Sequence, residues 1–304
     1  MCVAVAATVF GAIEAGGTKF VCLVASEPGE PVAETSFPTR EPEATLARAI
    51  AFFQGCAASG RELAAIGIAS FGPVELRRSS PRYGFITNTP KPGWSDTDLV
   101  GPVEAALGVP VGFDTDVNGA ALAEGHWGAA QGLETFVYLT VGTGIGGGAV
   151  VGGRPAHGLV HAEMGHVIVT RQRSDDYSGY CPFHADCLEA MASGPAIAAR
   201  FGRPAEELEG EALERAVELE AAYLAAGLRN IVYTIAPERI VVGGGVAGLP
   251  GLFPILRAKL AEALSGYPGL PEHDSADFVL PAALGQMAGP AGALALAELA
   301  ANQA

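Results

Sequence analysis

Residues 135–151, TFVYLTVGTGIGGGAVV, carry the pattern that decides the fold. An apolar run from Thr135 to Val141 ends in a glycine-rich segment, Gly142–Gly148. A second short apolar run, 149–151, follows and leads into the pair Gly152–Gly153. Apolar runs of this length, separated by a cluster of glycines, predict a strand, a tight turn and a second strand.

Two other segments repeat this combination of strand and glycine turn. Val3–Ile13 is followed by the turn Glu14–Lys19 and by a second apolar run, Phe20–Ala25, while Glu238–Val242 precedes Gly243–Gly245. Between these segments, apolar residues recur at helical spacing. Strands and helices therefore alternate, which predicts an α/β fold. The expected helices are Glu43–Ala58, Asp98–Leu107, Asn118–Trp127, Glu206–Ile235 and Ala291–Ala301.

Composition limits the class of protein and its partners. The chain has 304 residues, 49% of them hydrophobic, which is enough for one large domain or two ordinary ones. A net charge of −15 argues against nucleic acid or an anionic membrane surface as a general partner. The five cysteines do not resemble a secreted disulfide framework, and no apolar run is long enough to span a membrane. A cytoplasmic protein is expected.

Two interpretations of the glycine loops compete. Gly142-x-Gly144-x-x-Gly147 matches the dinucleotide pattern, but the residues that follow are too few and too rich in glycine for the helix of a Rossmann unit. The Walker pattern is absent. Each loop alone is explained as a tight turn, whereas three together, at 14–19, 142–148 and 243–245, favour a clamp of backbone N–H groups around nucleotide phosphates.

Four side chains between residues 161 and 189 have the spacing of a metal site. Cys181-x-x-His184-x-x-Cys187 places three ligands within seven residues, and His166 lies fifteen residues before the first of them. Two thiolates and two imidazoles suit tetrahedral Zn²⁺, and four protein ligands leave no position for an activated water, so a structural zinc is predicted. A Cys181–Cys187 disulfide and a pair of buried thiols are the alternatives.

Carboxylates near these motifs are candidates for substrate binding and chemistry. Glu163 and Glu189 lie beside metal ligands, which suggests a substrate pocket braced by the metal. Asp116 and Asn118 follow a predicted strand, 111–114, at the strand end where α/β folds bind ligands. On this stretch alone, an ordinary helix cap is the better explanation of Asp116.

Together these motifs resemble the ROK family of sugar kinases, and within it the bacterial zinc-containing fructokinase branch. The resemblance runs in family order over nearly the whole chain. The matching segments are Glu14–Lys19, Ser70–Pro73, Thr89–Trp94, Phe113–Asn118, Val141–Gly146, His161–His166, Cys181–Glu189, Ser193–Pro195 and Gly243–Val246.

The resemblance implies an actin-like ATPase (ribonuclease H-like) fold, with two lobes and a cleft for ATP and sugar between them. Residues 1–117 and a C-terminal helix, 285–304, are expected to form a small α/β lobe, and 118–284 a large α/β lobe that carries the zinc loop. The implied activity is a sugar kinase that phosphorylates a hexose with MgATP. D-fructose, converted to fructose 6-phosphate, is the first choice of substrate.

The resemblance also implies roles for individual residues. Asp116 is the expected catalytic base. The residues expected to bind the sugar are Glu163, His166, Glu189 and Asn118. The expected nucleotide-binding residues are Gly16, Gly17, Thr18, Lys19, Gly142, Thr143, Gly144, Pro195, Gly243, Gly244 and Gly245. The expected ligands of a structural Zn²⁺ are His166, Cys181, His184 and Cys187.

Three features depart from the common pattern of the family. Glu14 occupies a position where most ROK kinases have Asp, and its longer side chain should still reach a Mg²⁺-bound water. The zinc ligands have the C-x-x-H-x-x-C spacing of the fructokinase branch instead of the common C-x-C-G-x-x-G-C. Thr115 replaces an Asn that helps many glucokinases to hold a pyranose, which argues against glucose as the best substrate.

Alternatives remain within and beyond this class. Mannose or glucose could be the substrate, or the chain could be a non-catalytic, sugar-sensing ROK regulator. Such regulators carry a helix-turn-helix module before the first glycine hairpin, where this chain has ten residues ahead of Gly11. The presence of Asp116, Glu14 and the phosphate loops argues against a catalytically dead module. The expected partners are ATP and a small sugar, without nucleic acid or membrane, in a homodimer.

Overall fold

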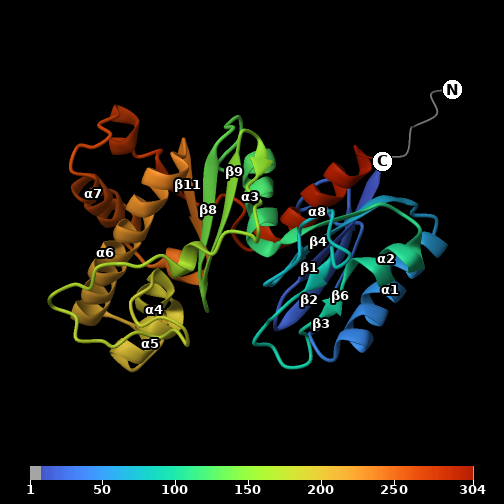
Figure 1. Ribbon diagram of the computed structural model, residues 1–304, viewed down its shortest axis with the longest axis horizontal. Coiled ribbons are helices and arrows are strands. Elements are labelled where there is room, and N and C mark those ends of the chain that lie inside the picture. Colours follow the sequence, from blue (N-terminus) through green and yellow to red (C-terminus); the bar gives the residue numbers. More distant parts are fainter. Residues whose placement is uncertain (1–7, 304) are drawn as a thin grey trace. The chain divides into compact units, whose positions relative to one another are not determined.

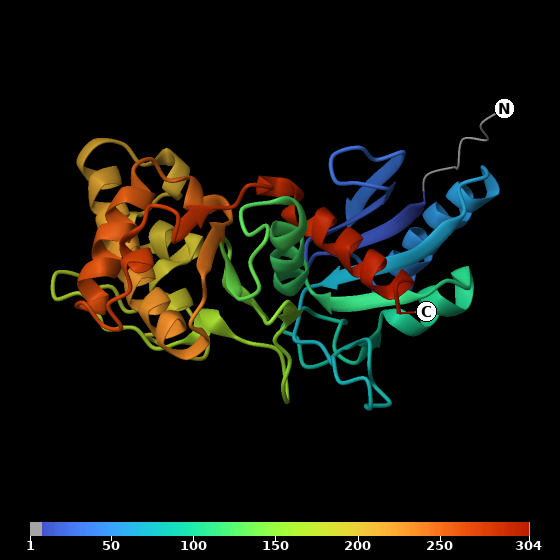
Figure 2. The ribbon, with the colours of Figure 1, turned by 90° about the horizontal axis from the view of Figure 1, so that it is seen from above.

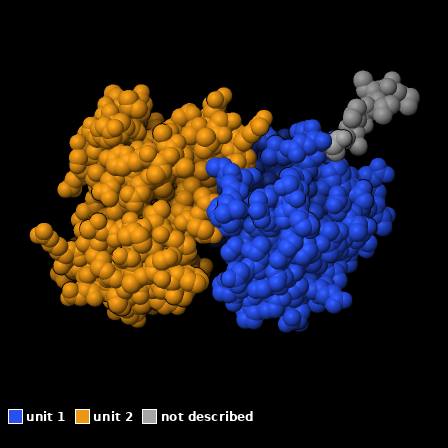
Figure 3. All heavy atoms as spheres, viewed as in Figure 1, with its two compact units in different colours: residues 1–127, 156–161, 286–304 blue, residues 128–155, 162–285 orange. Residues whose placement is uncertain are grey.

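The computed structural model describes residues 8–303, which form two compact units coloured separately in Figure 3. Unit 1 contains the described residues up to Trp127, a short strap, Ala156–His161, and the chain from Gln286 onward. Unit 2 contains Gly128–Pro155 and Ala162–Gly285. Positions 3–7 of the expected first strand lie outside the described residues.

Unit 1 is built on a five-stranded sheet with the order β3-β2-β1-β4-β7 (Figure 1). The first three strands pair antiparallel, and β4 and β7 add to β1 in parallel. A separate pair, β5 (Phe85–Ile86) and β6 (Thr97–Asp98), lies within the long loop before α2. The strands of the main sheet are β1 (Val9–Ala15), β2 (Lys19–Ala25), β3 (Ala33–Pro38), β4 (Leu63–Ser70) and β7 (Val111–Thr115).

Helices cover both faces of this sheet (Figures 1 and 2). Because strand side chains alternate between faces, Ile13 packs into the core beneath α1 and α2, whereas its neighbour Ala12 packs against α8. Helix α3 packs on α8, and the two backbones come so close that a Cβ on Gly292 would lie 2.4 Å from the carbonyl carbon of Gly119. The helices are α1 (Pro42–Ala58), α2 (Val100–Leu107), α3 (Asp116–Trp127) and α8 (Ala288–Ala301).

The contact between α8 and β4 also depends on a glycine, and this gives a test of the fold. A Cβ on Gly67 would lie 1.8 Å from the carbonyl oxygen of Ala293. We expect Gly67→Ala to cost about 3 kcal/mol or more, at or beyond the upper end for overpacked cores. In the control, Gly55→Ala, nothing lies within 4 Å of the new Cβ, so removing a helical glycine should stabilise α1 by about 0.5–1 kcal/mol. Urea unfolding followed by circular dichroism would measure both, and a Gly67→Ala midpoint at or above wild type would contradict the packing.

Unit 2 repeats the sheet topology of unit 1. Its order is β10-β9-β8-β11-β12, again with three antiparallel strands followed by two parallel additions. Helix α6 packs against α4 and α7. The strands are β8 (Phe136–Val141), β9 (Ile145–Val151), β10 (Arg154–Pro155), β11 (Arg239–Gly243) and β12 (Val279–Pro281). The helices are α4 (Leu188–Ala192), α5 (Gly194–Phe201), α6 (Gly210–Ile235) and α7 (Leu252–Leu264), with 3-10 turns η1 (Met164–His166), η2 (Ala205–Glu207), η3 (Gly245–Gly248) and η4 (Pro271–Asp274). A further turn, η5 (Gly285–Met287), begins at the last residue of unit 2 and continues into unit 1.

The central glycine segment is the clearest correction to the sequence prediction. The expected turn, Gly142–Gly148, is shorter, because β9 begins at Ile145. Glycines 146–148 lie inside the strand, paired with 138–140 of β8. Glycine is needed there because a Cβ on Gly147 would lie 2.6 Å from the sulfur of Met164.

Several expected helices begin at other residues for local reasons. The helix expected from Asp98 starts at Val100, because Asp98 belongs to β6 and its Oδ1 accepts a hydrogen bond from Gly101 N at 2.9 Å. The helix expected from Glu206 starts at Gly210, because Glu206 lies in the separate turn η2. Helices α4, α5 and α7 were not predicted, although apolar residues recur every four positions along α7. Helix α3 starts two residues earlier than expected, and α8 three.

The boundary expected between residues 117 and 118 falls inside α3, which the contacts assign to unit 1. The physical reason is the close backbone packing of α3 on α8. The strap Ala156–His161 also belongs to unit 1, although its neighbours in sequence on both sides belong to unit 2.

Among the described residues, no helix is both long and apolar enough to cross a membrane.

Candidate functional site

The turn from β7 into α3 carries the expected catalytic residues in unit 1. Asp116 is the first residue of α3, and its Oδ1 accepts a hydrogen bond from Val117 N at 2.9 Å. Asn118 is only 3% exposed, and its Nδ2 donates to Asp114 Oδ1 at 2.7 Å. Thr115 Oγ1 accepts from the backbone N of Asn118 at 3.1 Å. These bonds hold the turn in shape, and Asn118 takes part in two of them.

Asp114 had no predicted role, yet its carboxylate binds Thr115, Asn118 and His157 and so holds this turn together. Its Oδ2 lies 2.7 Å from Nε2 of His157 in the strap. The hydrogen bond to Asp114 raises the pKa of His157, and burial acts in the opposite direction. The available signal was a second acid only two residues before Asp116, at the end of the same predicted strand.

The first glycine turn, also in unit 1, is closed by contacts from a distant residue. Gly16 N donates to the carbonyl oxygen of Lys19 at 3.0 Å, and Thr39 Oγ1 donates to the carbonyl oxygen of Gly16 at 2.7 Å. Gly17, Thr18 and Lys19 are exposed at the tip, as a phosphate-binding turn requires.

Glu14 lies on β1, just before this turn. Burial is the main cause that raises its pKa, the positive charge of Lys19 lowers it, and the negative charge of Asp116 raises it. The negative charge of Asp116 therefore acts on Glu14 within unit 1. Such a pair of acids is a typical setting for a divalent cation that relieves the repulsion.

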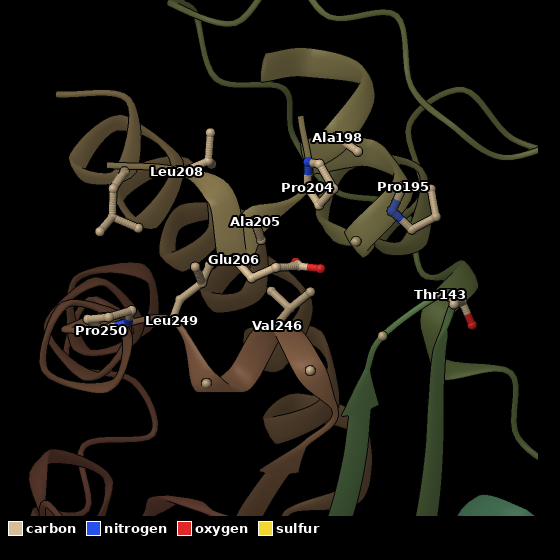
Figure 4. Close-up of a pocket in the computed structure, with 15 residues that line it drawn as sticks. Thr143, Pro195, Ala198, Pro204, Ala205, Glu206, Leu208, Val246, Leu249 and Pro250 are labelled. Atoms are coloured by element: carbon tan, nitrogen blue, oxygen red, sulfur yellow. The ribbon is translucent and has the colours of Figure 1, made fainter. Parts of the chain in front are cut away.

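The second glycine turn borders a cavity of about 840 Å³ in unit 2 (Figure 4). Gly142 N donates to the carbonyl oxygen of Gly144 at 2.9 Å, and Gly194 N, at the start of α5, donates to the carbonyl oxygen of Gly142 at 2.7 Å. These bonds fix the turn against the helix that carries Pro195. Sequence-predicted residues that line the cavity are Gly142, Thr143, Pro195 and Gly245.

The third glycine segment approaches the same cavity. Gly244 has a φ of +87°, and a Cβ there would lie 2.3 Å from the carbonyl oxygen of Val141, so only glycine allows this close approach. Gly245 lines the cavity, whereas the predicted Gly144, Gly243 and Gly244 are not among its lining residues. The remaining wall is mostly apolar, and none of its residues was predicted to bind nucleotide, although Gly194 and Val246 lie in the matching segments Ser193–Pro195 and Gly243–Val246. Its residues are Gly194, Ala198, Pro204, Ala205, Glu206, Leu208, Leu213, Val246, Gly248, Leu249 and Pro250.

The four predicted metal ligands come together in unit 2. One ligand atom from each of His166, Cys181, His184 and Cys187 lies within 4.8 Å of all the others. His166 Nδ1 is 3.6 Å from Cys187 Sγ and 3.9 Å from Cys181 Sγ. Tetrahedral zinc with its usual bond lengths separates such ligand atoms by about 3.5–3.8 Å. Both cysteines are free thiols, and burial raises the pKa of Cys187 to about 11.

The loop that carries Cys181 and Cys187 is stabilised by Arg171, a residue that was not predicted to have a role. Arg171 donates to the carbonyl oxygens of Ser178 and Ala185, both at 2.7 Å, and to that of Tyr177. Gly179 has a φ of +99°, and a Cβ there would lie 2.2 Å from the carbonyl oxygen of Ala185. These contacts hold the ligand loop in shape through its own backbone.

The expected sugar-binding residues of unit 2 are tied to the second glycine turn at one residue, Ile145. Glu189 Oε2 accepts a hydrogen bond from Ile145 N at 2.9 Å. A Cβ on Gly165, between Glu163 and His166, would lie 1.8 Å from the carbonyl oxygen of Ile145. Gly165 of the E-x-G-H segment thus lets η1 contact β9. The segment Glu163–His166 and Glu189 are therefore both held next to the second glycine turn.

A sheet topology repeated in two units, each with a glycine turn suited to phosphate, defines the actin-like ATPase fold. The chain belongs to the ROK family, whose model matches residues 10–300. The family and its relatives make the chain a sugar kinase, an activity that implies ATP and Mg²⁺.

Individual relatives are similar along their whole length. A fructokinase from Zymomonas mobilis is 46% identical over 301 residues, which cover 97% of this chain and 98% of the relative. A putative fructokinase from Bacillus subtilis is 44% identical, with 95% of each chain covered. The crystal structure of a ROK hexokinase from Thermus thermophilus superposes with a TM-score of 0.79 at 32% identity, covering 98% of this chain and all of that one.

Proposed function

We propose that the chain phosphorylates D-fructose to fructose 6-phosphate with MgATP. The observation that carries this proposal is the cavity of unit 2, where the glycine turn at Gly142–Thr143, the start of α5 and Gly245 converge. A volume of about 840 Å³ suits a nucleotide, because ligand sites usually measure about 300–1,000 Å³. The choice of fructose rests on the relatives, since two of them carry that name at 44–46% identity.

The nucleotide would bind with its phosphates at the glycine turn and its base at the apolar end of the cavity. In Figure 4, Thr143 and Pro195 lie at one end, and Leu208, Leu249 and Pro250 at the other. Backbone N–H groups at Thr143 and Gly144 would meet the phosphates, because the N–H of Gly142 already donates within the turn. Gly17–Lys19 of unit 1 is proposed to act in the same way, since the N–H of Gly16 likewise donates within its own turn. Such donors stabilise phosphoryl transfer by positioning and by neutralising charge.

Asp116 is proposed as the general base that accepts the proton of the sugar hydroxyl as this attacks the γ-phosphate. Glu14, whose pKa is raised mainly by burial and to a lesser extent by the charge of Asp116, is proposed to bind Mg²⁺ through a water. The sugar hydroxyls would be bound by Glu163, His166 and the oxygen of Glu189 that does not accept from Ile145. Asn118, whose Nδ2 donates to Asp114, would offer its amide oxygen to the sugar.

The four-ligand cluster is proposed to hold a structural Zn²⁺. The donor set fits, because His166 Nδ1 faces both sulfurs, which leaves Nε2 on the opposite side of the ring. Zinc bound at Nδ1 would fix the proton on Nε2 and hold the loop together. His166 could then only donate at Nε2, to a sugar hydroxyl, while Glu163 and Glu189 only accept. A free histidine would offer either role, so the cluster would sharpen the choice of sugar.

The test is an ADP-release assay with MgATP against fructose, mannose, glucose and N-acetylmannosamine, on protein with a measured zinc content. Turnover strongest with fructose supports the proposal. Preference for mannose or glucose would keep the reaction and change the substrate. No turnover with any sugar, in zinc-replete protein, would indicate a sensor or binding module.

The nucleotide part of the proposal has its own test in α5. Ala198 lines the cavity, so Ala198→Phe should fill part of it and raise the KM for ATP by about 10-fold, equivalent to about 1.4 kcal/mol. The KM for the sugar should stay unchanged. Ala258→Phe, an exposed position on α7, is the matched control and should change neither constant. Equal ATP constants for both variants would place the nucleotide elsewhere.

Two further aspects of the function are proposals. The cytoplasm is the expected compartment, because it supplies ATP and keeps thiols reduced, as Cys181 and Cys187 require for binding a metal. A homodimer is expected from the family resemblance, and light scattering of the purified protein would test it.

A further inference from the structure

The buried carboxylate of Asp114 has three hydrogen-bond partners in unit 1. The residue is 2% exposed. Oδ1 accepts from Thr115 N and from Asn118 Nδ2, both at 2.7 Å, while Oδ2 pairs with His157 Nε2, also at 2.7 Å. A buried carboxylate is stable only when its oxygens are bonded, so the loss of one partner weakens the whole arrangement.

His157 reaches Asp114 from the strap Ala156–His161, which is fastened at both ends. His157 and His161 pair with each other across an antiparallel bridge. His161 is 7% exposed, and its Nε2 accepts a hydrogen bond from Val74 N at 3.3 Å. The strap is therefore held in place on unit 1, and the ring of His157 is delivered to Asp114 at a fixed position.

We propose that His157 is a positioning residue for phosphoryl transfer: through Asp114 it holds the β7–α3 turn on which Asp116 lies. This inference rests on the proposed role of Asp116 as the base. Thr115 and Asn118, which flank Asp116 in sequence, are the two residues whose N–H groups bind Asp114 Oδ1. Without His157, Oδ2 would lose its partner, and the carboxylate would turn toward water and release the two flanking residues. Misplacement by about 1 Å can cost about 10²-fold in rate.

The test compares His157→Leu with His157→Gln. Leu fills the space but donates nothing, whereas the side-chain amide of Gln can donate at the place of Nε2. We expect His157→Leu to lower kcat about 10–100-fold, with the KM values for ATP and sugar within about 2-fold of wild type. His157→Gln should restore most of kcat. His126→Leu is the matched control, because His126 pairs with Glu298 at 3.3 Å in the same unit, and its kcat should not change.

A second comparison separates positioning from general destabilisation. In an Asp116→Asn background, His157→Leu should lower the residual turnover no further, because the base that it positions is already gone. Equal proportional losses in both backgrounds would overturn the inference, as would a His157→Leu kcat equal to wild type in an active enzyme. Wild-type protein that phosphorylates no sugar would instead overturn the proposed function, and this inference with it.

Discussion

Asp116→Asn should lower kcat by about 10²–10⁴-fold, the usual contribution of a general base, while ATP and the sugar still bind. The amide is nearly the same size as the carboxylate, and its oxygen can still accept the hydrogen bond from Val117 N that caps α3. The turn should therefore keep its shape, and only proton acceptance is lost. Steady-state kinetics, with calorimetric titration of each substrate, would measure turnover and binding separately.

Asp274→Asn provides the matched control for this prediction. It makes the same chemical change at an exposed position in η4, and its kcat should equal that of wild type. Substantial turnover by Asp116→Asn would remove Asp116 from the role of base. Loss of substrate binding together with turnover would show that the residue is needed to hold the site and would leave the base unassigned.

Cys181→Ser should remove the metal, raise the KM for the sugar and lower thermal stability together. A serine hydroxyl is a much poorer zinc ligand than a thiolate, so zinc affinity should fall by more than the roughly 10–100-fold caused by changes in outer-shell partners. His166 would then lose its fixed orientation, which explains a rise of about 10-fold or more in the sugar KM. The KM for ATP should change little, because no cavity-lining residue belongs to the metal cluster.

Elemental analysis, kinetics and thermal melts on one preparation would check this prediction. Cys56→Ser is the control, since Cys56 is a free, buried thiol on α1 in unit 1, and this variant should keep its zinc and its sugar KM. Normal zinc content and a normal sugar KM in Cys181→Ser would refute the structural-zinc proposal. Loss of zinc with an unchanged sugar KM would limit the metal to a role in stability.

The parts of the site that the sequence predicted are those encoded locally. Cys181, His184 and Cys187 lie within seven residues, so short-range spacing alone brings them near one another. The glycine turns were recognisable for the same reason, since a turn needs only a few adjacent residues with the right backbone freedom. The alternation of strands and helices predicted the α/β class, and the family resemblance supplied the actin-like fold, which the comparisons confirm.

The parts that were missed depend on residues distant in sequence. His157 meets Asp114 across 43 positions, and no local pattern marks either as a partner of the other. Part of the apolar wall of the cavity comes from residues between 204 and 213, a stretch without a motif. The length of the central turn was wrong because strand pairing with β8 and the contact of Gly147 with Met164 override the tendency of a glycine run to form a loop.

The sequence by itself determined which chemical groups this protein can offer: the four candidate metal ligands, the carboxylates and the glycines, because residue type and short spacing express those properties directly. Only the tertiary structure decided which of these groups are held in contact with one another. Ile145 ties Glu189 and the E-x-G-H glycine to the phosphate turn, and Asp114 ties the strap to the turn of Asp116. The physical reason is that such contacts form only after sheets and helices have packed, when buried polar groups must find partners among whatever residues the fold brings to them.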